Sequence, residues 1–166
     1  MKNIYLVGFM GTGKSTVGKE LSAMHHMRFV DMDEVIEYRQ KRQIADIFAK
    51  EGEAFFRQLE KSLLQELAGG SNAVVSCGGG IVLDPANIAL MKQTGLLVCL
   101  TARPDVVLDR TRRHTNRPLL NVPDPRAKIA ELLANRAPLY AQAEVTVDTS
   151  SFSIHQVAEA ISRHIA

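Results

Sequence analysis

The chain has 166 residues, of which 46% are hydrophobic and 23% are charged, and its formal net charge is +2. These values are typical of one globular domain with its own core, and so small a net charge gives no reason to expect nucleic-acid binding. No apolar run approaches the length of a membrane span, so we expect no membrane association.

Short apolar runs alternate with helical patterns along the whole chain. The runs that predict strands are residues 4–7, 28–31, 73–77, 96–100 and 145–148. Helices are expected near 14–24, 34–41, 44–50, 53–68 and 126–140, and others should begin at Pro85, at Pro104 and after Ser153, a candidate cap. Residues 119–126, broken by prolines, are expected to form a loop. Continuous apolar strands separated by helices predict an α/β fold, with a five-stranded parallel sheet covered on both faces, in a single domain over 1–166.

The amino terminus and the two cysteines bear on the compartment. The first expected strand begins almost at once, so we expect no signal peptide. Cys77 and Cys99 lie in apolar runs typical of inner strands, and we interpret them as buried free thiols rather than as a disulfide or metal pair. Together these features predict a protein of the reducing cytoplasm.

Residues 8–16, which read GFMGTGKST, follow the first expected strand. They have the G-x-x-x-x-G-K-S spacing of a phosphate-binding loop that opens a helix. Lys14 would reach the β- and γ-phosphates of ATP, and the Ser15 hydroxyl would bind Mg²⁺. The backbone N–H groups that should cradle the phosphates belong to Gly11, Thr12, Gly13, Lys14, Ser15 and Thr16.

Two carboxylates follow the second expected strand, in Asp31-Met32-Asp33. Alternation along the strand should aim both to the same side. One would hold a water on Mg²⁺, a role we give to Asp31, and Asp33 would meet a substrate hydroxyl. The alternative is a solvated helix start with Asp33 as the N-cap. Beside a phosphate loop, we favour the binding site.

Three glycines, Gly78, Gly79 and Gly80, follow the third expected strand. Ligands of open α/β sheets gather at the carboxyl ends of the strands, and glycines there let a small ligand approach the backbone. A flexible turn is the alternative.

Three arginines lie near these stretches. Arg57 lies three residues before Glu60 on the helix expected at 53–68, and Glu60 could hold its guanidinium in one rotamer. Arg117 begins the proline-broken segment, and Arg136 lies near the end of the helix expected at 126–140. A single arginine on a helix is usually a surface residue, but several around one phosphate site favour the recognition of phosphate and carboxylate.

Seven short motifs, in order along nearly the whole chain, resemble those of the shikimate kinase family. They are GTGKST (11–16), DxD (31–33), IADIF (44–48), FRxxE (56–60), GGG (78–80), RPLL (117–120) and RAPLY (136–140). The resemblance implies a P-loop NTPase fold of the nucleoside-monophosphate-kinase type, with a substrate-binding region near 33–60 and a mobile lid near 111–125. It also implies phosphoryl transfer from MgATP to the 3-hydroxyl of shikimate.

The same resemblance implies roles for individual residues. Asp33 would contact the ring hydroxyls and accept a proton, and Arg57 and Arg136 would clamp the carboxylate of shikimate. Gly79 would donate from its backbone, between Gly78 and Gly80. Arg117 would reach the phosphates from the lid, and Arg110 would lie along the adenine. Phe48 and Phe56 would line the ring of shikimate.

One departure and two alternatives accompany this interpretation. Residues 148–153 lack the arginine-bearing turn that the family often has near the adenine, so contacts there are not carried over. A gluconate-type kinase would share the phosphate loop and an acidic substrate, but it gives no reason for Arg57, Gly78–Gly80 and Arg136 together. A non-catalytic nucleotide-binding module should have lost Lys14, Asp33 or Arg117, and all three are present. We expect a monomer that binds small molecules only.

Overall fold

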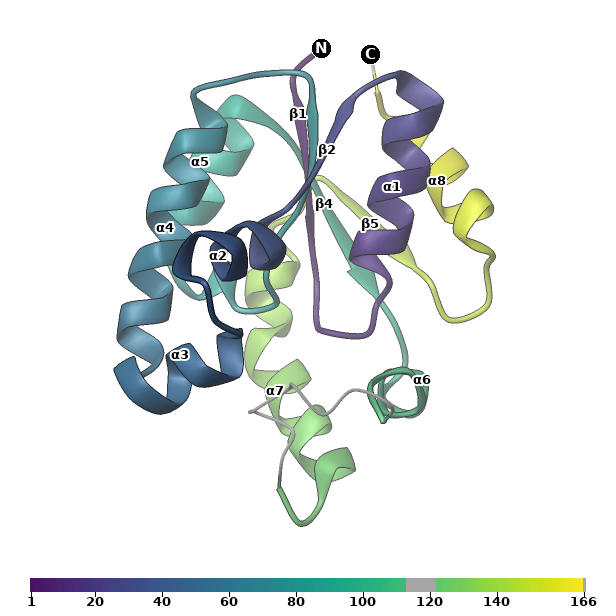
Figure 1. Cartoon of the computed structure of the whole chain (residues 1–166). Helices are drawn as coiled ribbons and strands as arrows, with labels where there is room; N and C mark the ends of the chain where they lie inside the picture. Colours follow the sequence, from purple (N-terminus) through teal and green to yellow (C-terminus); the bar gives the residue numbers. More distant parts are fainter. Residues whose placement is uncertain (113–121, 166) are drawn as a thin grey trace.

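The computed structural model describes residues 1–112 and 122–165, and these form the expected α/β architecture (Figure 1). The sheet has the order β2-β3-β1-β4-β5, and every neighbouring pair is parallel. Its strands are β1 (Asn3–Val7), β2 (Arg28–Asp31), β3 (Ala73–Ser76), β4 (Gly95–Thr101) and β5 (Val145–Asp148).

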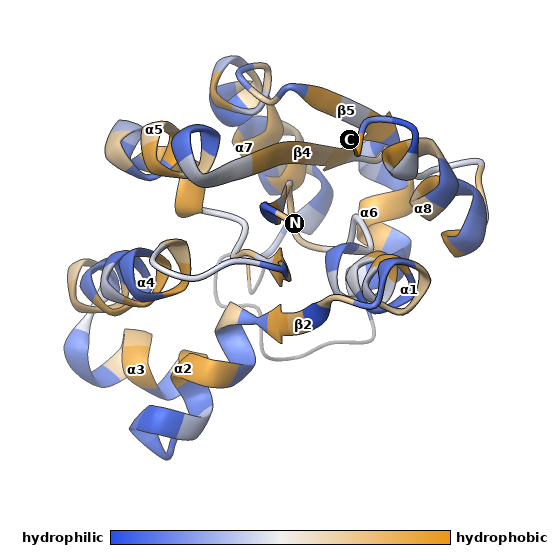
Figure 2. Ribbon diagram, turned by 90° about the horizontal axis from the view of Figure 1, so that it is seen from above, coloured by the Kyte–Doolittle hydropathy of each residue, from blue (hydrophilic) through white to orange (hydrophobic). Residues whose placement is uncertain are grey.

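Helices cover both faces of this sheet. The described helices are α1 (Lys14–His25), α2 (Met32–Gln40), α3 (Ile44–Glu51), α4 (Glu53–Ala68), the 3-10 turn η1 (Ile81–Leu83), α5 (Pro85–Thr94), α6 (Pro104–Thr111), α7 (Pro125–Tyr140) and α8 (Ile154–Ser162). Figure 2 shows the strands between α4 and α5 on one side and α1 and α8 on the other. None of the helices within the described ranges is both long and apolar enough to cross a membrane.

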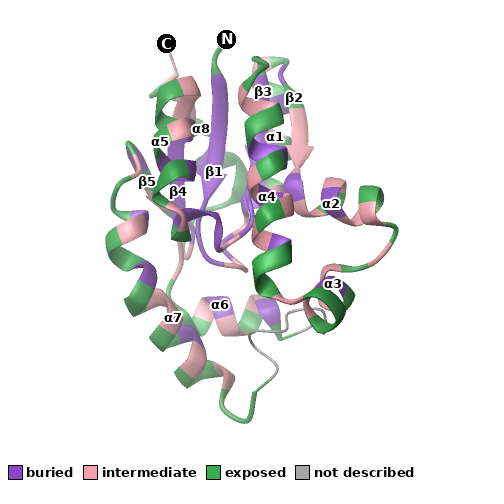
Figure 3. Ribbon diagram, turned by 90° about the vertical axis from the view of Figure 1, so that its left-hand side faces the viewer, coloured by how far each residue is buried: buried purple, intermediate pink, exposed green. Residues whose placement is uncertain are grey.

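The central strand β1 contributes to both hydrophobic cores. Tyr5 and Val7 pack on the side of α4 and α5, whereas Ile4 and Leu6 pack on the side of α1 and α8. All of β1 is buried, while the outer faces of the helices are exposed (Figure 3). This two-sided burial is the reason that the strand reads as a continuous apolar run rather than an alternating one.

Local capping chemistry sets several helix boundaries. Asp84 caps α5, with Pro85 in its first turn, and Ser153 forms a capping box with Gln156 at the start of α8. The helix expected from residue 34 begins instead at Met32, because Asp31 is its N-cap and accepts from the Glu34 N–H at 3.2 Å. The prediction that strand alternation orients Asp33 is therefore wrong, because Asp33 lies in the first turn of α2. Helix α7 begins at Pro125, within the segment 119–126 that we expected to be a loop.

The carboxyl ends of β1, β2 and β3 meet at one edge of the sheet. In the register, Ser76 of β3 lies beside Asp31 of β2 on one side and Leu6 of β1 on the other. The residues that follow these three strands are therefore brought together at this edge, which is where a parallel sheet binds its ligands.

Candidate active site

The loop between β1 and α1 is shaped by glycines. Gly11 and Gly13 have φ angles of +78° and +94°, which residues with side chains rarely adopt. A Cβ on Gly11 would also lie 2.8 Å from the Thr111 side chain of α6. The first turn of α1 carries no carboxylate, so its N–H groups and helix dipole present a positive end to the cavity.

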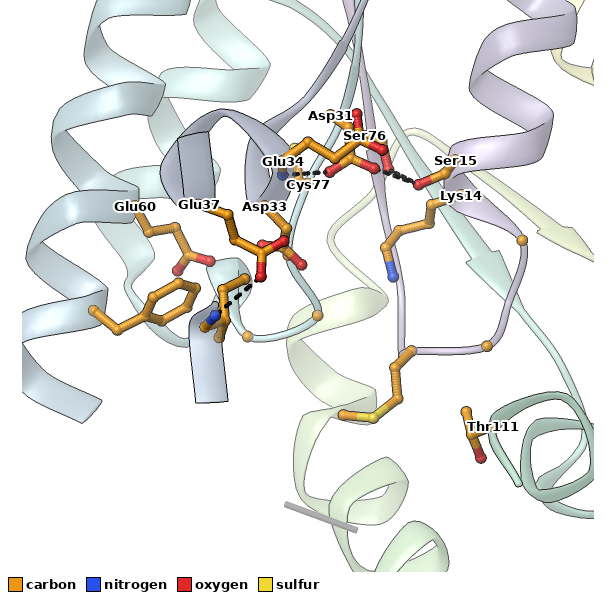
Figure 4. A pocket seen from close by; sticks show the side chains of 18 of the residues that line it. Lys14, Ser15, Asp31, Asp33, Glu34, Glu37, Glu60, Ser76, Cys77 and Thr111 are labelled. Carbon is orange, nitrogen blue, oxygen red and sulfur yellow. Dashed lines mark hydrogen bonds between the residues drawn. The ribbon is translucent and has the colours of Figure 1, made fainter. Parts of the chain in front are cut away.

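Lys14 and Thr12 make contacts within this loop. The Lys14 ammonium donates to the Gly8 and Phe9 carbonyls at 2.7 and 3.0 Å. In Figure 4, Lys14 and Asp33 point toward the same space between the loop and α2. The Thr12 hydroxyl donates to the Phe9 carbonyl at 2.7 Å and is buried, so the Thr12 side chain shapes the loop and does not line the cavity.

A cluster of oxygen atoms lies beside the loop. The Ser15 hydroxyl donates to Asp31 at 2.7 Å and lies 3.3 Å from the hydroxyl of Ser76 (Figure 4). Ser76 was not among the residues predicted from the sequence, although its place at the end of β3 could have indicated it. Hydroxyl and carboxylate oxygens are ligands that suit Mg²⁺.

The glycine turn after β3 is enclosed by four charged side chains. A Cβ on Gly78 would lie 2.6 Å from Glu60 Oε2 and 3.2 Å from Asp33 Oδ1, and one on Gly80 would lie 2.6 Å from Arg57 Cζ. A Cβ on Gly79 would make only ordinary contacts, including one of 3.6 Å to Arg136 Nη1. A Cβ at position 78 or 80 would therefore displace a charged side chain that faces the cavity, whereas space remains at Gly79.

Glu60 is buried at this turn. In the sequence, only its spacing from Arg57 indicated that it could contribute to the site. Its Oε1 lies 3.1 Å from Arg57 Nη1, and among the described residues its Oε2 has no hydrogen-bond partner. Loss of hydration raises the pKa of Glu60 to about 7, against the opposing charges of Arg57 and Arg136. The site therefore holds a carboxyl group that titrates near neutral pH.

Arg136 and Tyr140 face the turn from α7. Arg136 is only 4% exposed and its guanidinium lies over the Phe9 ring, 5.6 Å from its centroid. Within the described part of the chain, its Nη1 atom lacks a hydrogen-bond partner. The Tyr140 hydroxyl donates to the Gly79 carbonyl at 2.6 Å. A buried guanidinium with an unused donor is suited to an anionic ligand.

Arg110 of α6 contacts the backbone of the phosphate loop. Its guanidinium donates to the Gly11 carbonyl at 3.1 Å and to the hydroxyl and carbonyl of Thr149, each at 3.0 Å. The Thr149 hydroxyl donates in turn to the Thr12 carbonyl at 2.8 Å. Thr149 does not line the cavity but contacts Arg110, which does, and sequence reasoning missed it because nothing local distinguishes it from its serine neighbours.

Most of the predicted site residues line one cavity of about 460 Å³. Phe48 and Phe56, whose ring centroids are 5.0 Å apart, contribute apolar wall. The predicted residues that line it are Gly11, Gly13, Lys14, Ser15, Thr16, Asp31, Asp33, Arg57, Gly78, Gly79, Gly80, Arg110 and Arg136. Arg117, and most of the lid expected at 111–125, lie outside the described residues.

Comparisons with known proteins identify the family of this chain. The family model described as shikimate kinase matches residues 10–166. A shikimate kinase of Caldanaerobacter subterraneus subsp. tengcongensis is 44% identical over 98% of this chain and 95% of its own length. The solved structure of an Acinetobacter baumannii shikimate kinase in complex with shikimate superposes with a TM-score of 0.95 at 39% identity, covering 99% of this chain and 92% of that one.

The gluconate alternative finds much weaker support. A gluconokinase structure from Sinorhizobium meliloti has a TM-score of 0.58 at 16% identity, which shows a shared fold alone. The family model and the close relatives decide between the two activities. The chain therefore belongs to the shikimate kinase family and is an ATP-dependent phosphotransferase of aromatic amino acid biosynthesis.

Proposed function

We propose that this chain transfers the γ-phosphoryl group of MgATP to the 3-hydroxyl of shikimate, giving shikimate 3-phosphate and ADP. The observation that carries this proposal is that a phosphate-binding loop shares one cavity with the guanidinium groups of Arg57 and Arg136. Paired guanidinium groups favour an acid over a neutral sugar. A relative of TM-score 0.95 was solved in complex with shikimate, which supports the choice of acid.

In the nucleotide half, the amides from Gly11 to Thr16 would bind the phosphates at the positive end of α1. Lys14 would neutralise charge on the β- and γ-phosphates, and Arg110 would lie along the adenine. Arg117, outside the described residues, remains the candidate that reaches the phosphates from the lid.

We place Mg²⁺ at Ser15 and Asp31, with Asp31 acting through a water. These oxygen donors fit the ion, which prefers oxygen ligands and keeps several waters. When bound, Mg²⁺ offsets the negative charge of the phosphate oxygens.

In the acid half, Asp33 would contact the ring hydroxyls and accept the proton of the attacking one. Arg57 and Arg136 would bind the carboxylate, and Gly79 would donate from its backbone. Phosphoryl transfer asks for positioning and charge stabilisation more than for covalent chemistry, and these residues supply both.

A coupled assay of ADP release with shikimate or gluconate tests the proposal, and we expect turnover with shikimate alone.

Arg136→Ala should raise the KM for shikimate by about a hundredfold, because truncation removes a buried charged partner. Asp33→Asn should lower kcat by about a hundredfold, and Lys14→Ala should abolish turnover. Nucleotide binding without ADP release would favour a regulatory module instead.

We further propose a monomer of the cytoplasm. Cys77 and Cys99 are both free and buried, as suits a reducing compartment. Analytical ultracentrifugation with and without ligands tests the oligomeric state.

A further inference from the structure

Helix α7 presents two buried polar side chains to the glycine turn. Arg136 and Tyr140 are four residues apart, so they lie on one face of the helix. They are 4% and 7% exposed. Pro138 lies between them and has no N–H, so the last turn of α7 lacks one helical hydrogen bond. A contact between this end of the helix and another element would therefore help to fix the position of Arg136.

The Tyr140 hydroxyl supplies such a contact at the middle of the glycine turn. The carbonyls of Gly78 and Gly80 accept from the N–H groups of Ile81 and Leu83 inside the turn. The carbonyl of Gly79 accepts from Tyr140 at 2.6 Å. Because a trans peptide is planar, holding the Gly79 carbonyl fixes the Gly79–Gly80 peptide, which adjoins the Gly79 N–H that we assign to the acid.

The phenol remains a donor across the physiological pH range. Burial raises the pKa of Tyr140 to about 12, against the opposing charge of Arg136. Gly79 has no side chain that could hold its peptide, and a Cβ there would lie 3.6 Å from Arg136 Nη1. One hydroxyl thus joins the element that carries Arg136 to the backbone that Arg136 faces.

We propose that Tyr140 is a positioning residue for the acid half of the site. Its hydroxyl fixes the Gly79–Gly80 peptide relative to the end of α7, so that the glycine turn and Arg136 can bind the same carboxylate-bearing ligand. This inference rests on the proposed function. Tyr140 touches neither substrate nor nucleotide in this account and acts through Gly79 and Arg136.

The test is Tyr140→Phe, which removes only the hydroxyl. We expect the KM for shikimate to rise about tenfold, while kcat and the KM for MgATP stay within about twofold, because one hydrogen bond is lost on the acid side alone. The matched control is Tyr5→Phe. Tyr5 is fully buried and its hydroxyl lies 2.7 Å from that of Thr94, at the opposite end of the sheet. It should lose stability without a change in any KM.

Each result has a defined meaning. A KM for shikimate that stays at the wild-type value, or a parallel rise in both KM values, would overturn the inference and leave Tyr140 a structural anchor. Arg136→Lys in the same assay tests the proposed function separately, because an unchanged KM there would remove the carboxylate clamp whatever Tyr140 does.

A second measurement covers the case in which Tyr140→Phe does not fold. In protein labelled with 3-fluorotyrosine, the Tyr140 fluorine resonance should shift on adding shikimate, while those of Tyr5 and the exposed Tyr38 should not. A Tyr140 resonance that ignores shikimate would also overturn the inference.

Discussion

Glu60 is the described carboxyl group whose surroundings differ most from water. Arg57 on α4, Asp33 on α2 and Arg136 on α7 face it, and burial raises its pKa from 4.5 to about 7. Between these two values the folded protein holds a proton that the unfolded chain releases, so the contribution of Glu60 to stability is present below pH 4.5 and is lost as the pH rises through 7.

Glu60→Gln cannot ionise and should escape this loss. Relative to the wild type, its free energy of unfolding should improve by up to about 3 kcal/mol from pH 4.5 to pH 8, measured by urea denaturation. Glu66→Gln, on the exposed side of the same helix, is the control. Arg39 lowers the pKa of Glu66, so the effect of this control should lie mainly below pH 4.5, with the opposite sign, and should be small between pH 4.5 and pH 8. A Glu60→Gln difference that does not vary with pH would contradict the assignment.

At Gly80 the neighbouring arginine decides what a methyl group would do. The backbone of Gly80 has a negative φ, so alanine is allowed there, but its Cβ would displace the Arg57 guanidinium. Gly80→Ala should fold and should raise the KM for shikimate at least about tenfold. Gly69→Ala, where the nearest contact is 3.4 Å, should change neither stability nor KM appreciably. Equal kinetics for the two variants would contradict this account of the glycine turn.

At the scale of elements, caps fix where helices begin and contribute to stability without touching the site. Asp84 accepts from the Ala86 N–H at 2.9 Å and pairs with Lys61. Asp84→Ala should lower the free energy of unfolding by about 1 kcal/mol, measured by thermal or urea denaturation. Asp84→Asn should lower it by much less, because asparagine is an equally good cap. The backbone hydrogen bond from Ala86 lowers the pKa of Asp84, so the difference between the aspartate and alanine forms should shrink as the pH falls below 4. A change in the KM for shikimate in either variant would show that α5 is coupled to the site.

At the scale of the whole molecule, the two thiols report on global opening. Burial raises the pKa of Cys77 far above its usual range and that of Cys99 to about 11. Both should resist an aromatic disulfide reagent in the native protein and react once it is unfolded in guanidinium chloride. Saturation with shikimate and ADP, each at about 100 times its Kd, should slow labelling at least about a hundredfold, because ligands bind the folded state. Rapid native labelling of Cys77 would reveal local opening beside the site.

The sequence predicted most elements because their signals are local. Residues 28–31 and 145–148 were expected as strands and 53–68 as a helix, and the structure has each with those bounds. Its errors came from misleading local signals. Asp33 was the cap considered, although Asp31 caps α2, and the prolines of 119–126 suggested a loop, although Pro125 begins α7. Proline is accepted in the first turn of a helix, so Pro125, the second proline in that segment, marked a start.

What the sequence by itself determined is the phosphate loop, the order of strands and helices, and the identity of the charged residues that would gather at one edge of the sheet. The loop and the order of elements along the chain follow from spacing and periodicity, which act over a few residues, whereas the charged residues were identified largely through the resemblance of seven motifs to those of shikimate kinase. The tertiary structure alone decided that Glu60 titrates near neutral pH, that Thr149 holds Arg110 and that Tyr140 holds Gly79. Desolvation and hydrogen bonds between residues 39 or 61 positions apart depend on how distant segments pack, and no local pattern records that packing.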